Sequence, residues 1–287
     1  MPKYPDTPWR RLQTDLKQAG ARPRKRLSQN FLLNRTVVDK IISAAVLTPA
    51  DTVIEVGPGL GVLTEELAKS AGRVIAVELD HGLFTRLQKN LKANTNLHLV
   101  QGDILKIDLA QLLGSIREYK VVANLPYNIT SPVLNIFMRA ALRPLKMVVM
   151  LQKEVADSIM AGGGRLSVLG VGLRVHCIPS LVAYVPRRDF YPVSQVDSAV
   201  LHLDFLPQPL IPSSEQGTFM EMVRRGFRAP RKYLRNSLAL GLDIKTIDAE
   251  ALLREALIDP YLRAEDVTME GWLRLYTVTR SGEITGQ

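Results

Sequence analysis

The tetrapeptide Asn124-Leu125-Pro126-Tyr127 combines groups that could hold an exocyclic amino group for transfer of a methyl group. The Asn124 side-chain oxygen and the Leu125 backbone carbonyl can accept the two amine hydrogens, which turns the nitrogen lone pair toward an electrophile. Pro126 stiffens the turn, and Tyr127 offers a face that can stack on a base and tolerates a sulfonium charge. Such chemistry depends on positioning and electrostatics and needs no strong general base. The competing interpretation is an ordinary Asx turn with a packed tyrosine.

Glycines and acids follow short apolar segments in an order that suits a nucleoside cofactor. Gly57, Gly59 and Gly61 close one segment and open a helical pattern, where glycine lets the backbone approach a ligand or adopt positive φ. Glu78 ends the next segment, where its carboxylate could accept hydrogen bonds from both hydroxyls of a ribose. Asp103 follows a third segment and could meet the exocyclic amine of an adenine. A glycine-rich turn alone also arises from simple turn chemistry, so the evidence lies in the order of the whole set.

This order leaves two cofactor classes, dinucleotides and S-adenosylmethionine. Dinucleotide sites have the spacing G-x-G-x-x-G, with phosphates at the helix N-terminus. Here the spacing is G-x-G-x-G, and Glu55 precedes Gly57 by two residues. An acid at that point opposes a pyrophosphate but suits a cationic ligand, and it could help to order the loop around the methionine ammonium group. S-adenosylmethionine is the predicted cofactor, with S-adenosylhomocysteine as product; an NAD-dependent dehydrogenase is the alternative.

Alternating strand and helix patterns must position these residues. Apolar strands are expected at 52–56, 73–77, 97–100, 120–123 and 146–151, with helices at 37–46, 62–71, 83–91 and 132–142. This alternation is typical of a parallel sheet covered on both faces, whose ligands bind at the carboxyl ends of the strands. Strands at 181–185 and 199–205 are expected as a hairpin at the sheet edge. The predicted fold class is α/β, a Rossmann-like class I S-adenosylmethionine-dependent methyltransferase sheet with a small all-helical C-terminal domain.

Composition predicts three parts along the chain. Residues 1–22 are polar and contain three prolines, and they are expected to form an N-terminal arm. The methyltransferase domain is expected at 23–206. A proline-rich linker follows Leu206, and 207–287 are expected to form the helical domain, with helices at 219–227, 233–240, 249–256 and 269–277.

The formal net charge of +9 is concentrated in two segments. Residues 1–35 hold nine basic and two acidic residues, residues 219–235 hold six basic and one acidic, and the remainder is slightly acidic. Clustered positive charge predicts a polyanion partner, whereas the plainer interpretation is a solvated helix face and a basic tail. The predicted RNA-binding residues are Arg24, Lys25, Arg26, Arg224, Arg225, Arg228, Arg231 and Lys232.

Several classes of protein are excluded by composition. A chain of 287 residues with 46% hydrophobic residues can bury a sizeable core, and Cys177 has no second cysteine for a disulfide. No apolar run approaches the roughly 20 residues that span a bilayer, and no secretory signal is recognisable. The histidines show no metal-ligand spacing, so no metal is expected. The expectation is a cytoplasmic monomer.

Phe190 supplies a second aromatic side chain near the late strands. It could form the other wall of a base sandwich, as extruded bases are commonly held. The alternative is an ordinary phenylalanine of the hydrophobic core.

These motifs together resemble the ribosomal RNA adenine N6,N6-dimethyltransferase family over roughly residues 22 to 280, and they are most similar to its bacterial small-subunit branch. The segment 24–32 resembles the family's Gln-Asn-Phe-Leu signature, and the glycine loop, Glu78, Gly102-Asp103 and the tetrapeptide match its motifs in order. Segments 151–156, 190–198 and 227–238 match later motifs. The chain departs from the pattern at Ser28, at Ser194-Gln195 and within 229–232.

The resemblance implies roles for particular residues. It implies a cofactor site formed by Asn30, Leu32, Gly57, Gly59, Glu78, Leu79, Asp103, Ile104 and Asn124. It implies that the target adenine is held by Asn124, Leu125, Tyr127 and Phe190, with Pro126 in the same turn. It also implies that the substrate is a pair of adjacent adenines in the 3′-terminal hairpin loop of small-subunit rRNA, each of which is dimethylated. By the same resemblance, the rRNA is part of an assembling 30S subunit, and the helical domain helps to dock the enzyme on this subunit.

Other functions stay open at this point. The first is dimethylation of a large-subunit rRNA adenine, as in antibiotic resistance, although the basic all-helical tail favours the small subunit. The second is a checkpoint in ribosome assembly that binds RNA, with methylation secondary. A DNA adenine methyltransferase is disfavoured because no sizeable target-recognition domain is evident.

Overall fold

The computed structural model describes residues 29–160 and 165–281. The chain divides into two compact units. The first comprises residues up to Ala156 together with Ser180–Phe205, and the second comprises Asp157–Pro179 together with the chain from Leu206 onward. The arm expected at 1–22 lies outside the described residues.

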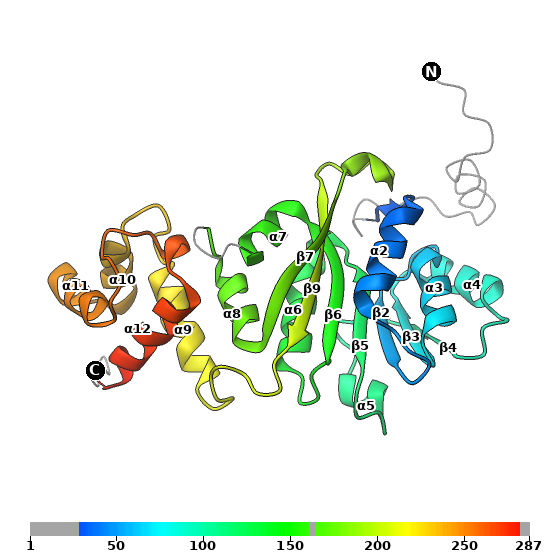
Figure 1. The fold of residues 1–287 in the computed structure, drawn as a ribbon, viewed down its shortest axis with the longest axis horizontal. Coiled ribbons are helices and arrows are strands. Elements are labelled where there is room, and N and C mark those ends of the chain that lie inside the picture. The colour runs from blue at the N-terminus through cyan, green and yellow to red at the C-terminus, as the bar shows by residue number, and fades with distance from the viewer. Residues whose placement is uncertain (1–28, 161–164, 282–287) are drawn as a thin grey trace, which may run out of the picture. The chain divides into compact units, whose positions relative to one another are not determined.

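The first unit is built on a seven-stranded sheet in the order β4-β3-β2-β5-β6-β9-β7 (Figure 1). β2 pairs in parallel with β3 and β5, β3 with β4, and β5 with β6, whereas β9 pairs antiparallel with β6. This arrangement confirms the predicted α/β fold, and β7 lies beside β9 at the edge where the late strands were expected. The strands are β2 (Thr52–Val56), β3 (Arg73–Glu78), β4 (Leu97–Gln101), β5 (Lys120–Asn124), β6 (Lys146–Gln152), β7 (Cys177–Val185) and β9 (Ser198–Phe205).

Helices precede, connect and follow the parallel strands, and α2, which precedes β2, shows why they form where they do. Val37, Val38 and Ile41 place apolar side chains on one face of α2, and all three are buried against the core. Asn34 caps this helix by accepting a hydrogen bond from the Thr36 amide at 3.0 Å. The helices are α2 (Arg35–Ala45), α3 (Val62–Ser70), α4 (His81–Asn90), α5 (Leu109–Leu113), α6 (Thr130–Arg139) and α7 (Lys153–Met160).

A separate two-stranded sheet joins the start of the described chain to a late loop. β1 (Phe31–Leu32) pairs antiparallel with β8 (Phe190–Tyr191), which follows the 3-10 helix η3 (Arg187–Asp189). The Leu33 amide donates to the Asp189 carbonyl at 2.8 Å, and Asn34 Nδ2 donates to Asp189 Oδ2 at 2.7 Å. This pairing fixes Phe31 and Leu32 although their partners lie far along the sequence.

The second unit consists of helices around one hydrophobic cluster. The cluster brings together Val171, Phe219, Leu238, Leu253 and Trp272, which come from different helices. The helical C-terminal part was predicted, but the structure divides the chain differently from a single boundary at 206, because Val171 and other residues of α8 join this cluster. The helices are α8 (Val168–His176), α9 (Gln216–Gly226), α10 (Leu234–Leu242), α11 (Thr246–Glu255), the 3-10 helix η4 (Ala264–Asp266) and α12 (Met269–Ser281).

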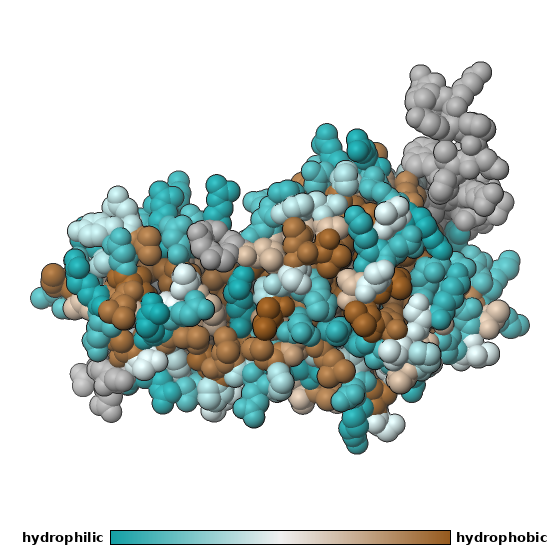
Figure 2. All heavy atoms as spheres, in the orientation of Figure 1, coloured by the Kyte–Doolittle hydropathy of each residue, from teal (hydrophilic) through white to brown (hydrophobic). Residues whose placement is uncertain are grey.

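Membrane crossing finds no support in the described helices. Among residues 29–160 and 165–281, no helix is both long and apolar enough to span a bilayer. The face drawn in Figure 2 mixes hydrophilic and hydrophobic residues.

A partly buried ion pair ties β5 to the turn before β2. Lys120 Nζ donates to Asp51 Oδ2 at 2.8 Å and to the Val46 carbonyl at 2.7 Å. Burial acts to raise the pKa of Asp51, but the hydrogen bonds from Lys120 and Thr48 outweigh it and lower the pKa below its ordinary value. The pair therefore contributes stability above the ordinary Asp pKa, and this contribution is lost as the pH falls through the lower folded-state pKa.

We expect Lys120→Met to lower the free energy of unfolding by about 1–3 kcal/mol at pH 7, because Asp51 would keep a partly buried charge without its cation. Denaturant unfolding of the wild type, Lys120→Met, Asp51→Asn and the double variant would measure this. Additive single-variant effects would show that the two side chains do not interact.

Candidate cofactor and substrate site

Hydrogen bonds continue past the strand ends and gather the predicted site residues at one edge of the sheet. The Gly57 amide donates to the Val77 carbonyl at 2.9 Å, and the Gly102 amide donates to the Glu78 carbonyl at 3.0 Å. The Leu125 amide donates to the Met150 carbonyl at 3.0 Å. The glycine loop, Glu78, the Gly102-Asp103 turn and the tetrapeptide therefore share the carboxyl edge, where α/β sheets bind ligands.

The glycine loop requires glycine at the positions the sequence singled out. Gly57, Gly59 and Gly61 all have positive φ, at 67°, 60° and 85°. A Cβ on Gly59 would lie 3.2 Å from the Phe31 ring, and one on Gly61 would lie 2.6 Å from a methyl group of Leu87. The loop is thus packed between β1 and α4, and a side chain at either position would displace it.

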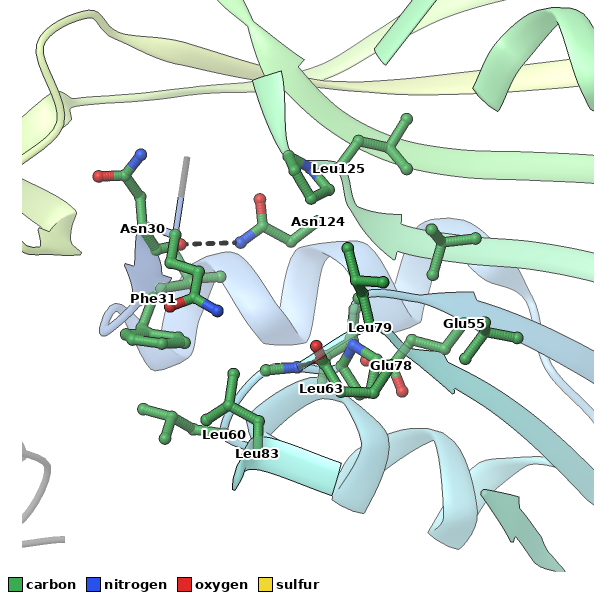
Figure 3. Close-up of a pocket in the computed structure, with 18 of the residues that line it drawn as sticks. Asn30, Phe31, Glu55, Leu60, Leu63, Glu78, Leu79, Leu83, Asn124 and Leu125 are labelled. Carbon is green, nitrogen blue, oxygen red and sulfur yellow. Dashed lines mark hydrogen bonds between the residues drawn. The ribbon is translucent and has the colours of Figure 1, made fainter. Parts of the chain in front are cut away.

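A single cavity at this edge collects the predicted residues. In Figure 3, Asn124 and Glu78 approach it from different strands, with Asn30 and Phe31 contributed by the segment around β1. All of the predicted cofactor residues line it: Asn30, Leu32, Gly57, Gly59, Glu78, Leu79, Asp103, Ile104 and Asn124. Leu125, Pro126 and Tyr127 line it as well.

Sequence reasoning missed several apolar residues of the cavity wall. Phe31, Leu60 and Leu83 pack together beside the glycine loop, and all three line the cavity. Phe31 lies within the Gln-Asn-Phe-Leu segment, but the family resemblance implies a cofactor role only for its neighbours Asn30 and Leu32. The pairing of β1 with β8, which the sequence pattern did not indicate, turns Phe31 onto Gly59.

The Glu78 carboxylate is held rigidly at the end of β3. Its Oε2 accepts from the Gly59 amide at 3.1 Å, and its Oε1 accepts from the Asp80 amide at 2.8 Å. Burial raises the pKa of Glu78, partly opposed by these amides. The Leu79 amide is a third backbone donor to this carboxylate. A carboxylate has about four acceptor sites, so a site remains for a hydroxyl of a ligand in the cavity.

Glu55 is the second carboxyl in the cavity wall, and it is fully buried in β2. Its Oε2 has no hydrogen-bond partner among the described residues. Burial is the main cause that raises the pKa of Glu55 to about 8, and the neighbouring negative charge of Glu78 adds to it. A hydrogen bond from the Thr64 side chain partly opposes this rise in the pKa. A buried acid with one unpaired oxygen is still costly to ionise, so a cation nearby would favour its charged form.

The charge of the lining suits a cationic cofactor. Glu55, Glu78 and Asp103 line the cavity, and the described lining residues include no lysine, arginine or histidine. A pyrophosphate would find neither a counter-charge nor a neutral surface there. A sulfonium and an ammonium group would find a negative counter-charge. The residues present therefore fit S-adenosylmethionine and disfavour a dinucleotide.

The tetrapeptide is oriented by contacts on both sides of Asn124. Asn124 Nδ2 donates to the Asn30 carbonyl at 3.3 Å, which leaves the side-chain oxygen to accept (Figure 3). The Tyr127 hydroxyl lies 2.6 Å from Ser198 Oγ and 3.3 Å from Ser194 Oγ, and both serines are buried. Ser194, one of the departures from the family pattern, thus helps to fix the tyrosine.

The structure places Phe190 differently from the expected second wall of a base sandwich. Its side chain is 1% exposed and packs in the hydrophobic core with Val185 and Val200. It does not line the cavity. The pairing of β8 with β1 draws this residue inward, so contact with a base would require the core packing to open.

The described RNA-binding candidates all belong to the second unit. Arg224 and Arg225 lie on α9 and both contact Glu221, at 3.2 Å and 3.3 Å. Arg228, Arg231 and Lys232 lie exposed in the loop between α9 and α10. The other candidates, Arg24, Lys25 and Arg26, lie outside the described residues.

A sheet of this topology with an acidic cavity at its carboxyl edge defines the chain as an S-adenosylmethionine-dependent methyltransferase. Comparison with known proteins refines this class. The model of the family "Ribosomal RNA adenine dimethylase" matches residues 20–280, close to the range over which the motifs showed a resemblance. The chain belongs to this family.

Named relatives agree with this assignment. The chain is 48% identical to "Ribosomal RNA small subunit methyltransferase A" of Dehalococcoides mccartyi, over 90% of this chain and 88% of the relative. It is 42% identical to the protein of the same name from Moorella thermoacetica, over 92% and 94% of the two chains.

Solved structures show the same fold. The crystal structure of the 23S rRNA methyltransferase ErmE is 30% identical, with a TM-score of 0.72 over 87% of this chain and 99% of that one. A dimethyladenosine transferase from Plasmodium falciparum is 24% identical, with a TM-score of 0.70 over 88% and 98%.

We expect Glu55 to make stability depend on pH in the cofactor-free protein. Between the ordinary pKa of 4.5 and about 8, the folded protein holds a proton on Glu55 that the unfolded chain has lost, so stability falls as the pH rises. As the pH rises from 5.5 to 7.5, the free energy of unfolding of the wild type should therefore fall by about 2–3 kcal/mol relative to that of Glu55→Gln. Denaturant titrations at several pH values measure this, with Glu65→Gln as an exposed control; parallel curves for wild type and Glu55→Gln would contradict it.

We expect Glu78→Gln to weaken S-adenosylmethionine binding by at least about tenfold, because the amide replaces a carboxylate that accepts from backbone amides and would accept from a ligand hydroxyl. Isothermal titration calorimetry would measure the affinity, and the melting temperature would show whether the variant stays folded. An unchanged affinity in a folded variant would remove Glu78 from the cofactor site.

Proposed function

We propose that this protein uses S-adenosylmethionine to dimethylate N6 of two adjacent adenines in the 3′-terminal hairpin loop of small-subunit rRNA. The observation that carries the small-subunit target is the similarity to proteins named small-subunit methyltransferases, at 48% and 42% identity over about nine-tenths of the chain. The tetrapeptide at the cavity edge supports the amine as the reacting group.

The second candidate is a 23S rRNA adenine dimethyltransferase. The similarity to ErmE favours it, since the two folds agree over most of both chains. At 30%, however, the identity to ErmE is well below that to the small-subunit relatives.

Within the cavity, Glu78 would bind the ribose hydroxyls, while Asp103 would meet the amine of the cofactor adenine and Leu79 and Ile104 would flank it. Gly57 and Gly59 let the backbone approach the ligand. Asn30 and Leu32 would close the cavity from the side of β1. When bound, S-adenosylmethionine supplies an electrophilic methyl group.

The chain's own part in the reaction is to position the target nitrogen. The Asn124 side-chain oxygen and the Leu125 carbonyl would accept the two N6 hydrogens, which favours a more tetrahedral nitrogen with its lone pair directed at the methyl group. Tyr127, held by Ser194 and Ser198, would stack on the base. The N6 proton becomes acidic once the nitrogen is alkylated, so catalysis rests on positioning and electrostatics.

The wider setting of the reaction forms part of the same proposal. The RNA would be presented by an assembling 30S subunit, and the basic residues at 24–26 and 224–232 would contact it. The protein would act as a monomer in the cytoplasm and without a metal. Among the described residues, no group of three or more potential ligands is placed to hold a metal ion.

Labelled S-adenosylmethionine and unmethylated small ribosomal subunits provide the direct test. We expect label on two adjacent adenines of the 3′-terminal hairpin loop, each carrying two methyl groups when the nucleotides are mapped by mass spectrometry. Label confined to large-subunit rRNA in a parallel reaction would support the second candidate and overturn the first.

Asn124→Ala should reduce kcat for methylation by at least about a hundredfold, because it removes a hydrogen-bond acceptor that orients the reacting nitrogen. Binding to small subunits should stay within about twofold of the wild type, measured by filter binding. Asn135→Ala, which changes a half-buried asparagine on α6 that does not line the cavity, is the matched control. Retained methylation by Asn124→Ala would move the reaction centre elsewhere.

A further inference from the structure

Two exposed tyrosines meet on the surface of the second unit. Tyr233 and Tyr261 are 50% and 48% exposed, their ring centroids lie 5.6 Å apart, and the rings are inclined by 73°. They come from loops that hydrogen bonds hold side by side, from the Leu234 amide to the Leu262 carbonyl at 2.6 Å and from the Arg235 amide to the Pro260 carbonyl at 3.2 Å. We call this pair the tyrosine platform.

The platform is fixed before any partner binds. The Arg235 guanidinium lies 4.3 Å from the centre of the Tyr261 ring, and its Nη1 donates to the Tyr261 hydroxyl at 3.1 Å. The same nitrogen donates to Glu250 Oε2 at 2.9 Å. Tyr261 is therefore held by a stacked, hydrogen-bonded arginine, which lowers the entropy cost of binding a ligand on this surface.

The platform adjoins a strongly basic loop, residues 228–232. No ion pair of Arg228, Arg231 or Lys232 occurs among the described residues, in contrast to Arg224 and Arg225, which share Glu221.

This loop is also fixed to α10. The buried Ser237 hydroxyl accepts from the Ala229 amide at 2.8 Å and donates to the Gly226 carbonyl at 2.6 Å. Uncompensated cations thus stand on a rigid loop beside exposed aromatic rings.

Cations next to exposed aromatic faces suit a ligand that carries both phosphates and flat bases. An acidic peptide would use the cations but leave the rings without a stacking partner. We propose that the tyrosine platform stacks on an unpaired base of the RNA substrate while Arg231 and Lys232 contact the adjoining phosphates. This inference rests on the proposed function, because it takes the substrate to be RNA.

The test separates stacking from charge by salt dependence. The probe is an unmethylated, protein-free small-subunit rRNA transcript, with binding measured from 50 to 300 mM salt. Tyr233→Ala should weaken binding about tenfold at every salt concentration and leave the slope of log affinity against log salt unchanged. Arg231→Ala combined with Lys232→Ala should instead make that slope shallower by roughly 0.7–0.9 for each charge removed.

Matched variants keep the test sharp. Tyr233→Phe should bind like the wild type because its ring still stacks, and Leu240→Ala, an exposed residue of α10, should leave binding unchanged. A Tyr233→Ala variant that is folded by circular dichroism and binds the transcript normally would overturn the proposal. So would a loss of binding seen only with assembled subunits, since it would assign the platform to a ribosomal protein.

The assay uses neither cofactor nor methylation, so its failure is distinguishable from failure of the proposed function. Label mapped to a different rRNA would overturn the small-subunit assignment without deciding whether the tyrosines stack. In that case the same salt titration is repeated with an unmethylated transcript of the rRNA that received the label. A tenfold loss of affinity for Tyr233→Ala supports stacking, and normal binding overturns it.

Discussion

The alignment of parallel strands at one edge is the constraint on which the whole site depends. β2, β3, β4 and β5 run in the same direction, so their carboxyl ends bring together residues that are far apart in sequence. Backbone hydrogen bonds beyond the strands, such as Gly57 to Val77, extend this register into the loops. The Glu78 carboxylate then accepts from the Gly59 amide, so that the acid and the glycine loop hold each other in place. A change in the pairing register of one strand would separate the Glu78 carboxylate from the glycine loop.

Burying two acidic side chains in the cavity wall has an electrostatic cost that a cationic cofactor can offset. Glu55 is buried with an unpaired oxygen, and its neighbour Glu78 carries like charge. Replacing Glu55 by an apolar residue would remove this cost, but it would also remove the preference for a cation. The arrangement is an example of local destabilisation concentrated at a functional site, with the stability supplied by the buried apolar strands around it.

The sequence was informative where local pattern determines structure. The strands from β2 to β6 are short and mostly apolar, and the glycines and acids at their ends have a fixed order, so the cavity residues could be predicted. Pairings between segments that are distant in sequence could not be predicted. β1 joins β8 through two residues on each side, which places Phe190 in the core and Phe31 in the cavity wall. α8 carries no local sign that it packs with Phe219 and Trp272, so the unit it joins was not foreseen. The short helices α5 and α7 offered too little periodicity to be recognised.

Selection of one adenine from a ribosomal RNA cannot come from the cavity alone. In the proposed reaction, Asn124, Leu125 and Tyr127 would recognise only features that every adenine shares, an amine and an aromatic face. The crystal structure of the 23S rRNA methyltransferase ErmE agrees with this fold over most of both chains, so the same fold occurs in an enzyme named for another rRNA. Discrimination must arise from surfaces that contact RNA outside the reacting base. In the described part of the chain, the basic loop and the tyrosine platform combine charge, aromatic faces and rigidity. Charge alone would attract any polyanion, whereas fixed aromatic faces would restrict where an unpaired base can dock, and this restriction would supply selectivity.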